Sequence, residues 1–317
     1  MRANNSRVEL RVRGTNLVVH RLTPPHARRK APAVSIVHRR TAAASTAPHP
    51  LDRLLAERRP IVMGILNLTP DSFADGGRFV DPATALAHAE RMIAAGADII
   101  DIGAESTRPY PGMRPVSAED ELTRLMPVLP QVIALGVPVS IDTIKAEIAA
   151  RALDVGATIV NDVWGLQRDP QMASVVAAHD VPVVVTHNRE TVDPALDILA
   201  DLEAFFSRSL EIAWSAGIAR NRIVLDPGIG FGKTPEQSLA AIAGIPRLRD
   251  FGLPLLIGLS RKRFINAVSP SAPQDRLAGS LAGAVLAVLE GAAIVRVHDV
   301  AETVQALRVA AAIRAAR

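Results

Sequence analysis

The sequence lacks cysteine, has few aromatic residues and contains no apolar run long enough to cross a bilayer. None of its 317 residues is cysteine, which excludes a disulfide framework, thiolate metal sites and a cysteine nucleophile, and favours the reducing cytoplasm. Aromatic residues make up 3% of the chain, too few to predict a surface that stacks nucleic-acid bases. A membrane helix needs about 20 predominantly apolar residues, and no such run occurs. We therefore expect neither a nucleic-acid nor a membrane partner.

The positive charge of the chain is concentrated near its N-terminus. Residues 1–60 contain 13 Lys and Arg against three acidic residues, whereas the remainder contains 23 basic and 29 acidic residues. The body is therefore acidic, which again argues against a nucleic-acid surface. With 49% hydrophobic and 21% charged residues, the chain has enough apolar material for one large domain or two average ones.

Residues 1–58 are interpreted as a basic, flexible extension that precedes the domain. Pro, Ala, Ser, Thr and Arg dominate residues 24–50, which is the composition of a linker. Apolar residues alternate with charged ones over residues 8–12 and return at 17–19, a pattern compatible with a short hairpin. An Arg-rich, acid-poor segment is also typical of organelle transit peptides, and a start codon assigned too far upstream would leave the same composition.

The body, residues 59–317, repeats one unit in which a short apolar run precedes an amphipathic helix rich in Ala and Leu. The apolar runs are residues 61–66, 99–102, 137–141, 158–160, 181–185, 223–225, 255–259 and 292–297. Helical patterns between them include residues 82–95, 117–135 and 235–249. Eight such units predict an α/β fold, a parallel (β/α)8 TIM barrel. A doubly wound open sheet is the alternative.

Polar residues follow every apolar run, at the end of the barrel where active sites of this fold lie. They are Asn67, Glu105 to Arg108, Asp142, Asn161 with Asp162, His187 with Asn188, Asp226, Ser260 to Lys262, and Arg296 with His298. The cations among them suit an anionic ligand such as a phosphate or pyrophosphate. The carboxylates and amides suit a heterocycle with several N–H donors.

Other familiar motifs fail on their spacing. Residues 228–234 resemble a P-loop, but the spacing before Gly-Lys-Thr is one residue short, and the same stretch misses G-x-G-x-x-G by one position. Only His187 and His298 are strand-end histidines, which disfavours a metal hydrolase. No G-x-S-x-G motif is present, so a serine esterase is not expected.

Separated motifs along about four-fifths of the chain resemble the dihydropteroate synthases of folate biosynthesis, a pterin-binding family. They are Met-Gly-Ile-Leu-Asn-Leu-Thr-Pro-Asp-Ser-Phe-Ala-Asp-Gly-Gly at 63–77, Glu-Ser-Thr-Arg-Pro at 105–109, Asp-Pro-Gly-Ile-Gly-Phe-Gly-Lys at 226–233, Ser-Arg-Lys at 260–262, Arg-Leu-Ala-Gly-Ser at 276–280 and Arg-Val-His at 296–298. The resemblance implies a transferase that condenses 6-hydroxymethyl-7,8-dihydropterin diphosphate with 4-aminobenzoate, releasing pyrophosphate and 7,8-dihydropteroate.

The resemblance also implies roles for individual residues. The residues expected to bind the pterin are Asp142, Asn161, Asp226 and Lys262. Arg296 and His298 would grip the diphosphate, and Asn67 would help to hold Mg²⁺ on it. The residues expected near the aminobenzoate are Thr107, Arg108, Phe231 and Ser260, and Lys233 is counted with the substrate-binding group. The expected catalytic set is Asp142, Lys262, Arg296 and His298.

The family pattern is followed with few departures. Ala104 replaces a commoner Gly, residues 110–115 lengthen the second loop, and Asn188-Arg189 stands where Met is common. Family members are usually homodimers, and the Ala-rich segments 277–289 and 304–316 offer such a surface. The alternatives are a non-catalytic pterin-binding paralogue and a pterin-dependent methyltransferase barrel.

Overall fold

The computed structural model describes residues 9–12, 15–18, 48–69, 81–105 and 116–316. The chain divides into two compact units, Met1–Thr46 and Ala47–Arg317. In the first unit, β1 (Glu9–Val12) and β2 (Thr15–Val18) pair antiparallel. This pairing is the short hairpin that the alternation of apolar and charged residues at 8–12 suggested.

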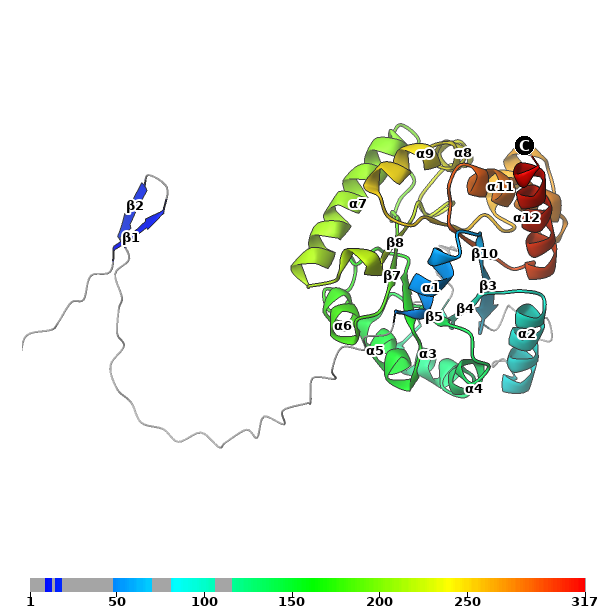
Figure 1. Ribbon diagram of the computed structural model, residues 1–317, viewed down its shortest axis with the longest axis horizontal. Helices are drawn as coiled ribbons and strands as arrows, with labels where there is room; N and C mark the ends of the chain where they lie inside the picture. The colour runs from blue at the N-terminus through cyan, green and yellow to red at the C-terminus, as the bar shows by residue number, and fades with distance from the viewer. Residues whose placement is uncertain (1–8, 13–14, 19–47, 70–80, 106–115, 317) are drawn as a thin grey trace, which may run out of the picture. The chain divides into compact units, whose positions relative to one another are not determined.

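The second unit is a parallel barrel, so the predicted (β/α)8 fold is confirmed. Its strands are β3 (Ile61–Asn67), β4 (Ile99–Gly103), β5 (Val139–Asp142), β6 (Ile159–Asp162), β7 (Val183–Thr186), β8 (Ile223–Asp226), β9 (Leu256–Ile257) and β10 (Ile294–Val297). They run in the order β8-β7-β6-β5-β4-β3-β10-β9, and a parallel bridge between Leu225 and Leu255 joins the two ends of the sheet. Figure 1 shows the helices arranged as a ring around these strands.

The helices cover the outer face of the barrel. They are α2 (Pro82–Ala94), α3 (Ala118–Leu125), α4 (Leu129–Ile133), α5 (Ala146–Val155), α6 (Met172–His179), α7 (Ile198–Ser215), α8 (Pro235–Ala243), α9 (Ile245–Leu248), α10 (Arg263–Val268), α11 (Leu277–Leu289) and α12 (Val300–Ala315). Two predicted helices are each broken into two. Pro127 interrupts residues 117–135 between α3 and α4, because proline supplies no N–H for the helical ladder. Gly244 separates α8 from α9, because glycine is a poor helix former and Pro246 lies in the first turn of α9.

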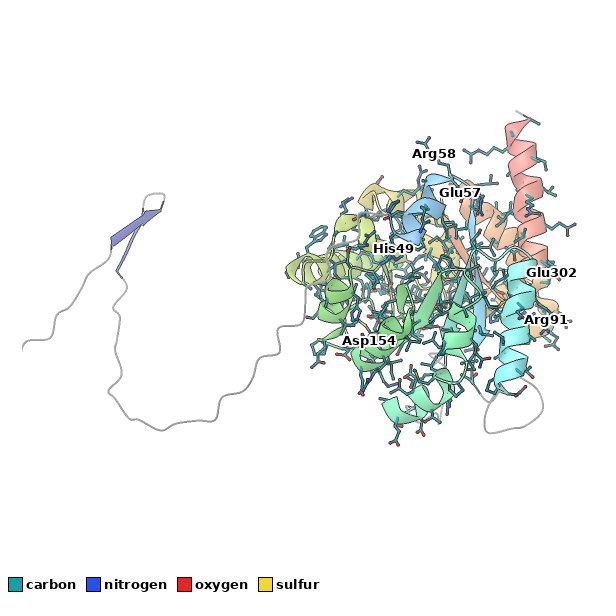
Figure 2. The ribbon with its side chains drawn as sticks, turned by 60° about the horizontal axis from the view of Figure 1, so that its bottom comes forward. His49, Glu57, Arg58, Arg91, Asp154 and Glu302 are labelled. Carbon is teal, nitrogen blue, oxygen red and sulfur yellow. The ribbon has the colours of Figure 1, made fainter. Side chains whose placement is uncertain are left out.

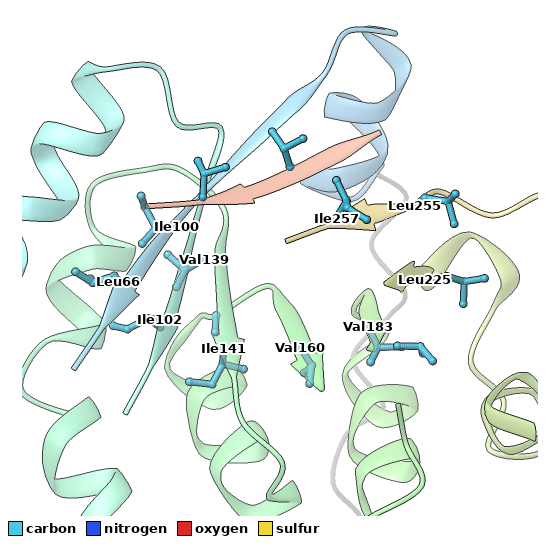
Figure 3. Packing of buried hydrophobic residues seen from close by; sticks show 14 of the residues in the cluster. Leu66, Ile100, Ile102, Val139, Ile141, Val160, Val183, Leu225, Leu255 and Ile257 are labelled. Atoms are coloured by element: carbon cyan, nitrogen blue, oxygen red, sulfur yellow. The ribbon is translucent and has the colours of Figure 1, made fainter. Parts of the chain in front are cut away.

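Strand residues alternate between the barrel interior and the helical layer. The outward set packs with the helices into the larger apolar core, and Figure 3 shows part of it from Leu66 to Ile257. The inward set forms a second apolar cluster near the N-terminal ends of the strands, whose members are Leu51, Ile61, Met63, Ile99, Ile159, Val184, Val224, Leu256 and Ile294. Further along the strands, the inward-facing residues are the polar residues of the candidate active site.

Helix α1 (Pro50–Ala56) contributes Leu51 to that inner cluster. His49 and Asp52 form a capping box at its start, and Asp52 also pairs with Arg222 at 2.7 Å. Figure 2 shows His49 and Glu57 at the two ends of this helix. The expected boundary at residue 58 assigned α1 to the extension, whereas the compact unit begins at Ala47 because Leu51 is buried among the strands.

Within the described ranges, no helix is both long and apolar enough to cross a membrane.

Candidate active site

The inward parity of the strands brings most of the predicted polar residues to one end of the barrel. Register pairs align Asn67 with Gly103, Gly103 with Asp142, and Asp142 with Asn161. Asp226 and Arg296 share this inward parity on β8 and β10. Asp162 instead lies on the outward side of β6, where it accepts the backbone N–H groups of Trp164 and Leu166 and supports a turn.

A carboxylate that sequence analysis missed lies at the centre of this group. Asp101 of β4 is fully buried, and its Oδ2 accepts hydrogen bonds from Arg296 Nε at 2.6 Å and from Asn161 Nδ2 at 3.1 Å. Arg296 also donates through Nη2 to Asp142 Oδ2 at 2.7 Å. One guanidinium thus holds two carboxylates, and the amide of Asn161 is fixed by the first of them.

Several oxygens of this network have no partner. Among the described residues, the buried oxygens Asp101 Oδ1, Asp142 Oδ1 and Asn161 Oδ1 receive no hydrogen bond, and neither does Thr186 Oγ1. Buried polar atoms are nearly always paired in folded proteins, so a cluster of orphaned acceptors indicates a ligand that supplies N–H donors. A flat heterocycle with ring N–H and amino groups has that chemistry.

Burial perturbs the acids of the site. Burial raises the pKa of Asp142 to about 7, although the charge of Arg296 opposes the shift. Burial also raises the pKa of Asp226, with Lys262 as the main opposing charge. Burial by itself would lower the pKa of Arg296, but Asp101 and Asp142 raise it, so the guanidinium stays charged. The site therefore combines a permanent cation, Arg296, with carboxylates that are costly to ionise when no ligand faces them.

Lys262 is held by the loop that follows β8. Its Nζ donates to the Ile229 carbonyl at 2.5 Å and lies 4.8 Å from the centroid of the Phe231 ring. The same loop begins with a turn in which the Gly228 N–H donates to Asp226 Oδ1 at 2.8 Å. Lys262, Asp226 and Phe231 are thus brought together as the motifs predicted.

Ser260 and His298 lie next to each other at the ends of β9 and β10. His298 Nδ1 is 3.0 Å from Ser260 Oγ, and the His298 N–H donates to the same oxygen at 3.3 Å. Arg261, by contrast, turns away from the site to pair with Asp299. Ser260 and His298 therefore form a polar pair at the site, beside the Lys262 loop.

Lys233 and His187 have surroundings different from those the sequence suggested. Both side chains are buried, and the Lys233 amine donates to His187 Nδ1 and to backbone carbonyls. His187 in turn contacts Asp201 of α7, another residue that sequence analysis did not single out. The described hydrogen bonds of these two side chains go to each other, to Asp201 and to backbone carbonyls, and none goes to an orphaned oxygen.

Thr107, Arg108 and residues 70–77 of the first loop lie outside the described residues. Glu105, at the start of the second loop, is described. Its carboxylate accepts the Val116 N–H at 3.0 Å and the Lys145 ammonium at 2.5 Å. Lys145 also pairs with the fully buried Glu121 at 2.6 Å. Glu105 and Val116 are the described residues on either side of the second loop, and their hydrogen bond joins them. The ion pair between Glu105 and Lys145 holds both near the end of β5.

Among the residues that can be located, no group of three or more His, Cys, Asp or Glu side chains could hold a metal on protein ligands alone. The partly exposed amide of Asn67 offers a hard oxygen at the end of β3. Mg²⁺ usually takes one or two protein oxygens and completes its shell with water and substrate phosphates. Asn67 fits that mode of binding.

Comparison with known proteins gives consistent matches over the barrel. The family described as pterin binding enzyme matches residues 63–298. A dihydropteroate synthase from Bacillus subtilis is 46% identical over 245 residues, covering 77% of this chain and 85% of that protein. A Clostridium difficile dihydropteroate synthase crystallised with pteroic acid superposes with a TM-score of 0.77 at 46% identity, over 81% of this chain and 97% of that one. A Xanthomonas albilineans dihydropteroate synthase with 4-aminobenzoic acid gives 0.77 at 43% identity, over 81% and 94%.

Proposed function

The chain belongs to the pterin-binding enzyme family, and on that premise we propose that it is a dihydropteroate synthase. It joins 6-hydroxymethyl-7,8-dihydropterin diphosphate to 4-aminobenzoate and releases pyrophosphate, a transferase reaction of folate biosynthesis. One observation carries the proposal, namely the orphaned acceptors of Asp101, Asp142 and Asn161 beside the partly buried guanidinium of Arg296. A dihydropterin presents ring N–H and amino donors along one edge, which matches these oxygens.

The reaction breaks the C–O bond between the pterin methylene carbon and the diphosphate, and it forms a C–N bond to the arylamine, which loses a proton to solvent. Positive charge develops on the pterin as the diphosphate leaves. The Asp142 carboxylate stabilises that charge, because it is held in place by Arg296 before the reaction begins. An arylamine is a weak base, so the step requires no strong general base.

The departing anion needs cations and donors on the other side of the reacting carbon. Lys262 and His298 supply them next to Ser260. Arg296 can donate to the diphosphate through Nη1 and still hold both carboxylates, because its described hydrogen bonds to Asp101 and Asp142 use Nε and Nη2. Mg²⁺, when bound, would neutralise charge on the diphosphate, and we assign Asn67 as its protein ligand. We assign Thr107, Arg108 and Phe231 to the aminobenzoate.

The proposal extends to assembly and location. Apolar side chains are exposed on two neighbouring helices, Leu286 and Leu289 on α11 and Val309 and Ile313 on α12. Exposed apolar faces of this kind are characteristic of protein interfaces, and we propose that this one joins two copies of the chain in a homodimer. A cytoplasmic location, expected from the cysteine-free sequence, stays a prediction.

The test is pyrophosphate release by the purified protein with dihydropterin diphosphate and Mg²⁺, with and without 4-aminobenzoate. Release that requires the arylamine, and that falls by about 100-fold or more in Lys262→Ala, is the expected result. Binding of the pterin without any turnover would instead favour the non-catalytic paralogue. Methyl transfer without pyrophosphate release would favour the methyltransferase barrel.

A further inference from the structure

Lys233 is a buried amine whose donors are all used inside the protein. The residue is 7% exposed. Its Nζ donates to His187 Nδ1 at 2.7 Å, to the Gly228 carbonyl at 2.9 Å and to the Phe231 carbonyl at 3.1 Å. Burial lowers the pKa of Lys233 to about 7, although the charge of Asp226 opposes the shift. The protonated group has three hydrogens, which these three acceptors occupy, and the His187 carbonyl lies further away at 3.5 Å. It has no donor left for a substrate.

His187 connects this ammonium to helix α7. Its ring is fully buried, with the Phe205 ring 4.7 Å away, and its Nε2 is 2.9 Å from Asp201 Oδ2. A carboxylate partner requires the proton on Nε2, which leaves the Nδ1 lone pair to accept from Lys233. Burial, with the charge of Lys233, lowers the pKa of His187 to about 3, so the ring is neutral and keeps this tautomer. Asp201 is fixed on its other side by Arg189 at 3.0 Å.

The two carbonyls that Lys233 holds lie on either side of Ile229 in the sequence. Ile229 is the residue whose carbonyl receives Lys262, and Phe231 is the residue whose ring faces it. The start of the loop is also pressed against the end of β7. Gly228 has a φ of +61°, and a Cβ there would lie 1.9 Å from the His187 carbonyl oxygen. Lys233 therefore holds the segment that positions Lys262 at two points, the Gly228 carbonyl before Ile229 and the Phe231 carbonyl after it.

We propose that Asp201, His187 and Lys233 form a positioning relay that fixes residues 228–231 and, through them, the ammonium of Lys262. Lys233 acts on the site through the loop and does not bind the substrate. The expected loss of activity rests on the proposed function. The positioning of Lys262 can be tested separately, because it can be measured as binding of the pterin.

A double-mutant cycle with Lys233→Met and Lys262→Ala in the full chain tests the relay. Methionine matches the lysine side chain up to Cε and removes the Nζ donors. Lys233→Met is expected to lower kcat/KM on the order of 10- to 100-fold, and to weaken binding of dihydropterin diphosphate measured by calorimetry without 4-aminobenzoate. In the Lys262→Ala background the same change should have less than about a twofold effect on either quantity, since its target is gone.

If Lys233→Met lowers kcat/KM and pterin affinity by the same factor with and without Lys262, the proposal is overturned. Lys233 would then act independently of Lys262, as a direct ligand would. If the wild-type protein binds the pterin but releases no pyrophosphate, the proposed function fails while the cycle on the dissociation constant still decides the relay. If Lys233→Met does not fold, Asp201→Asn replaces it, since the amide weakens the hold on the His187 tautomer with little change of shape.

Arg222→Met is the matched control for lost stability. Arg222 is a largely buried cation just before strand β8, at the opposite end from Asp226, and it pairs with Asp52 and Asp180. Its substitution should lower the melting temperature and leave kcat/KM within about twofold of wild type. A comparable loss of kcat/KM in this variant would attribute the Lys233 effect to destabilisation alone and would overturn the relay.

Discussion

Asp101→Asn should weaken the barrel and the site together. The substitution keeps the shape of the side chain and removes the charge that Arg296 and Asn161 share. A hydrogen bond to a charged partner contributes about 1.5–3 kcal/mol, and removing one member of a buried ion pair costs about 3–5 kcal/mol. Arg296 keeps Asp142 as a partner, and Asn161 can donate to the new amide oxygen, so the lower range applies.

We therefore expect the free energy of unfolding to fall by about 2–3 kcal/mol. For a domain of this size, that corresponds to a melting temperature lower by roughly 5–10 °C in calorimetry. The kcat/KM should fall on the order of 10- to 100-fold, because Arg296 and Asn161 lose their common anchor.

Ser140→Ala is the matched control, since Ser140 is the register partner of Asp101 on β5 and is equally buried. Its hydroxyl has no hydrogen-bond partner, so its removal should change the unfolding free energy by less than about 0.5 kcal/mol. An Asp101→Asn protein as stable as wild type would refute the anchoring role of Asp101. A Ser140→Ala protein as unstable as Asp101→Asn would show that any change in this layer is costly.

Three further predictions concern the site acid, the β8 loop and the dimer surface. Because a pKa of about 7 leaves Asp142 protonated below neutrality, pterin affinity should rise from pH 6 to pH 8, and Asp142→Asn should flatten that rise in calorimetric titrations. Gly228→Ala should cost more than about 2 kcal/mol in denaturant unfolding, whereas Gly136→Ala, with a φ of +85° but nothing within 4 Å, should cost only about 1 kcal/mol. Leu286→Glu should halve the mass measured by light scattering, while Leu239→Glu, exposed on α8, should not; an unchanged mass would place the dimer contact elsewhere.

The periodic sequence was sufficient to predict the barrel and the end at which its polar residues gather, because both depend on local spacing. Alternation within a strand also separates Asn161, which points inward, from Asp162, which does not. The same rule could have found Asp101, two residues before Gly103 on the inward side of β4. Asp101 was overlooked because it lies within the apolar run at residues 99–102, where an acidic residue does not fit the pattern of a buried strand.

The surroundings of Lys233 could not have been predicted in this way. Its acceptors belong to His187, directly after β7, and to the turn that carries it, and their convergence depends on left-handed backbone at Gly228, Gly230 and Gly232. Spacing alone placed this lysine next to the substrate residues. Only the tertiary arrangement distinguishes a lysine that faces the ligand from one that faces away from it.

The seating of helix α1 determines when the barrel can be completed during synthesis. Asp52 and Arg222 are separated by 170 residues, and the inner cluster around Leu51 draws on strands as late as β10. At about 5–20 residues per second, the ribosome needs on the order of 10–35 s to make Arg222 after α1 has been made. Throughout that interval the apolar cluster that buries Leu51 lacks Val224, Leu256 and Ile294, so we expect the first helix of the barrel to be among the last to dock. A chain shortened past Pro50 would finish its strands and still leave their apolar N-terminal layer open to water.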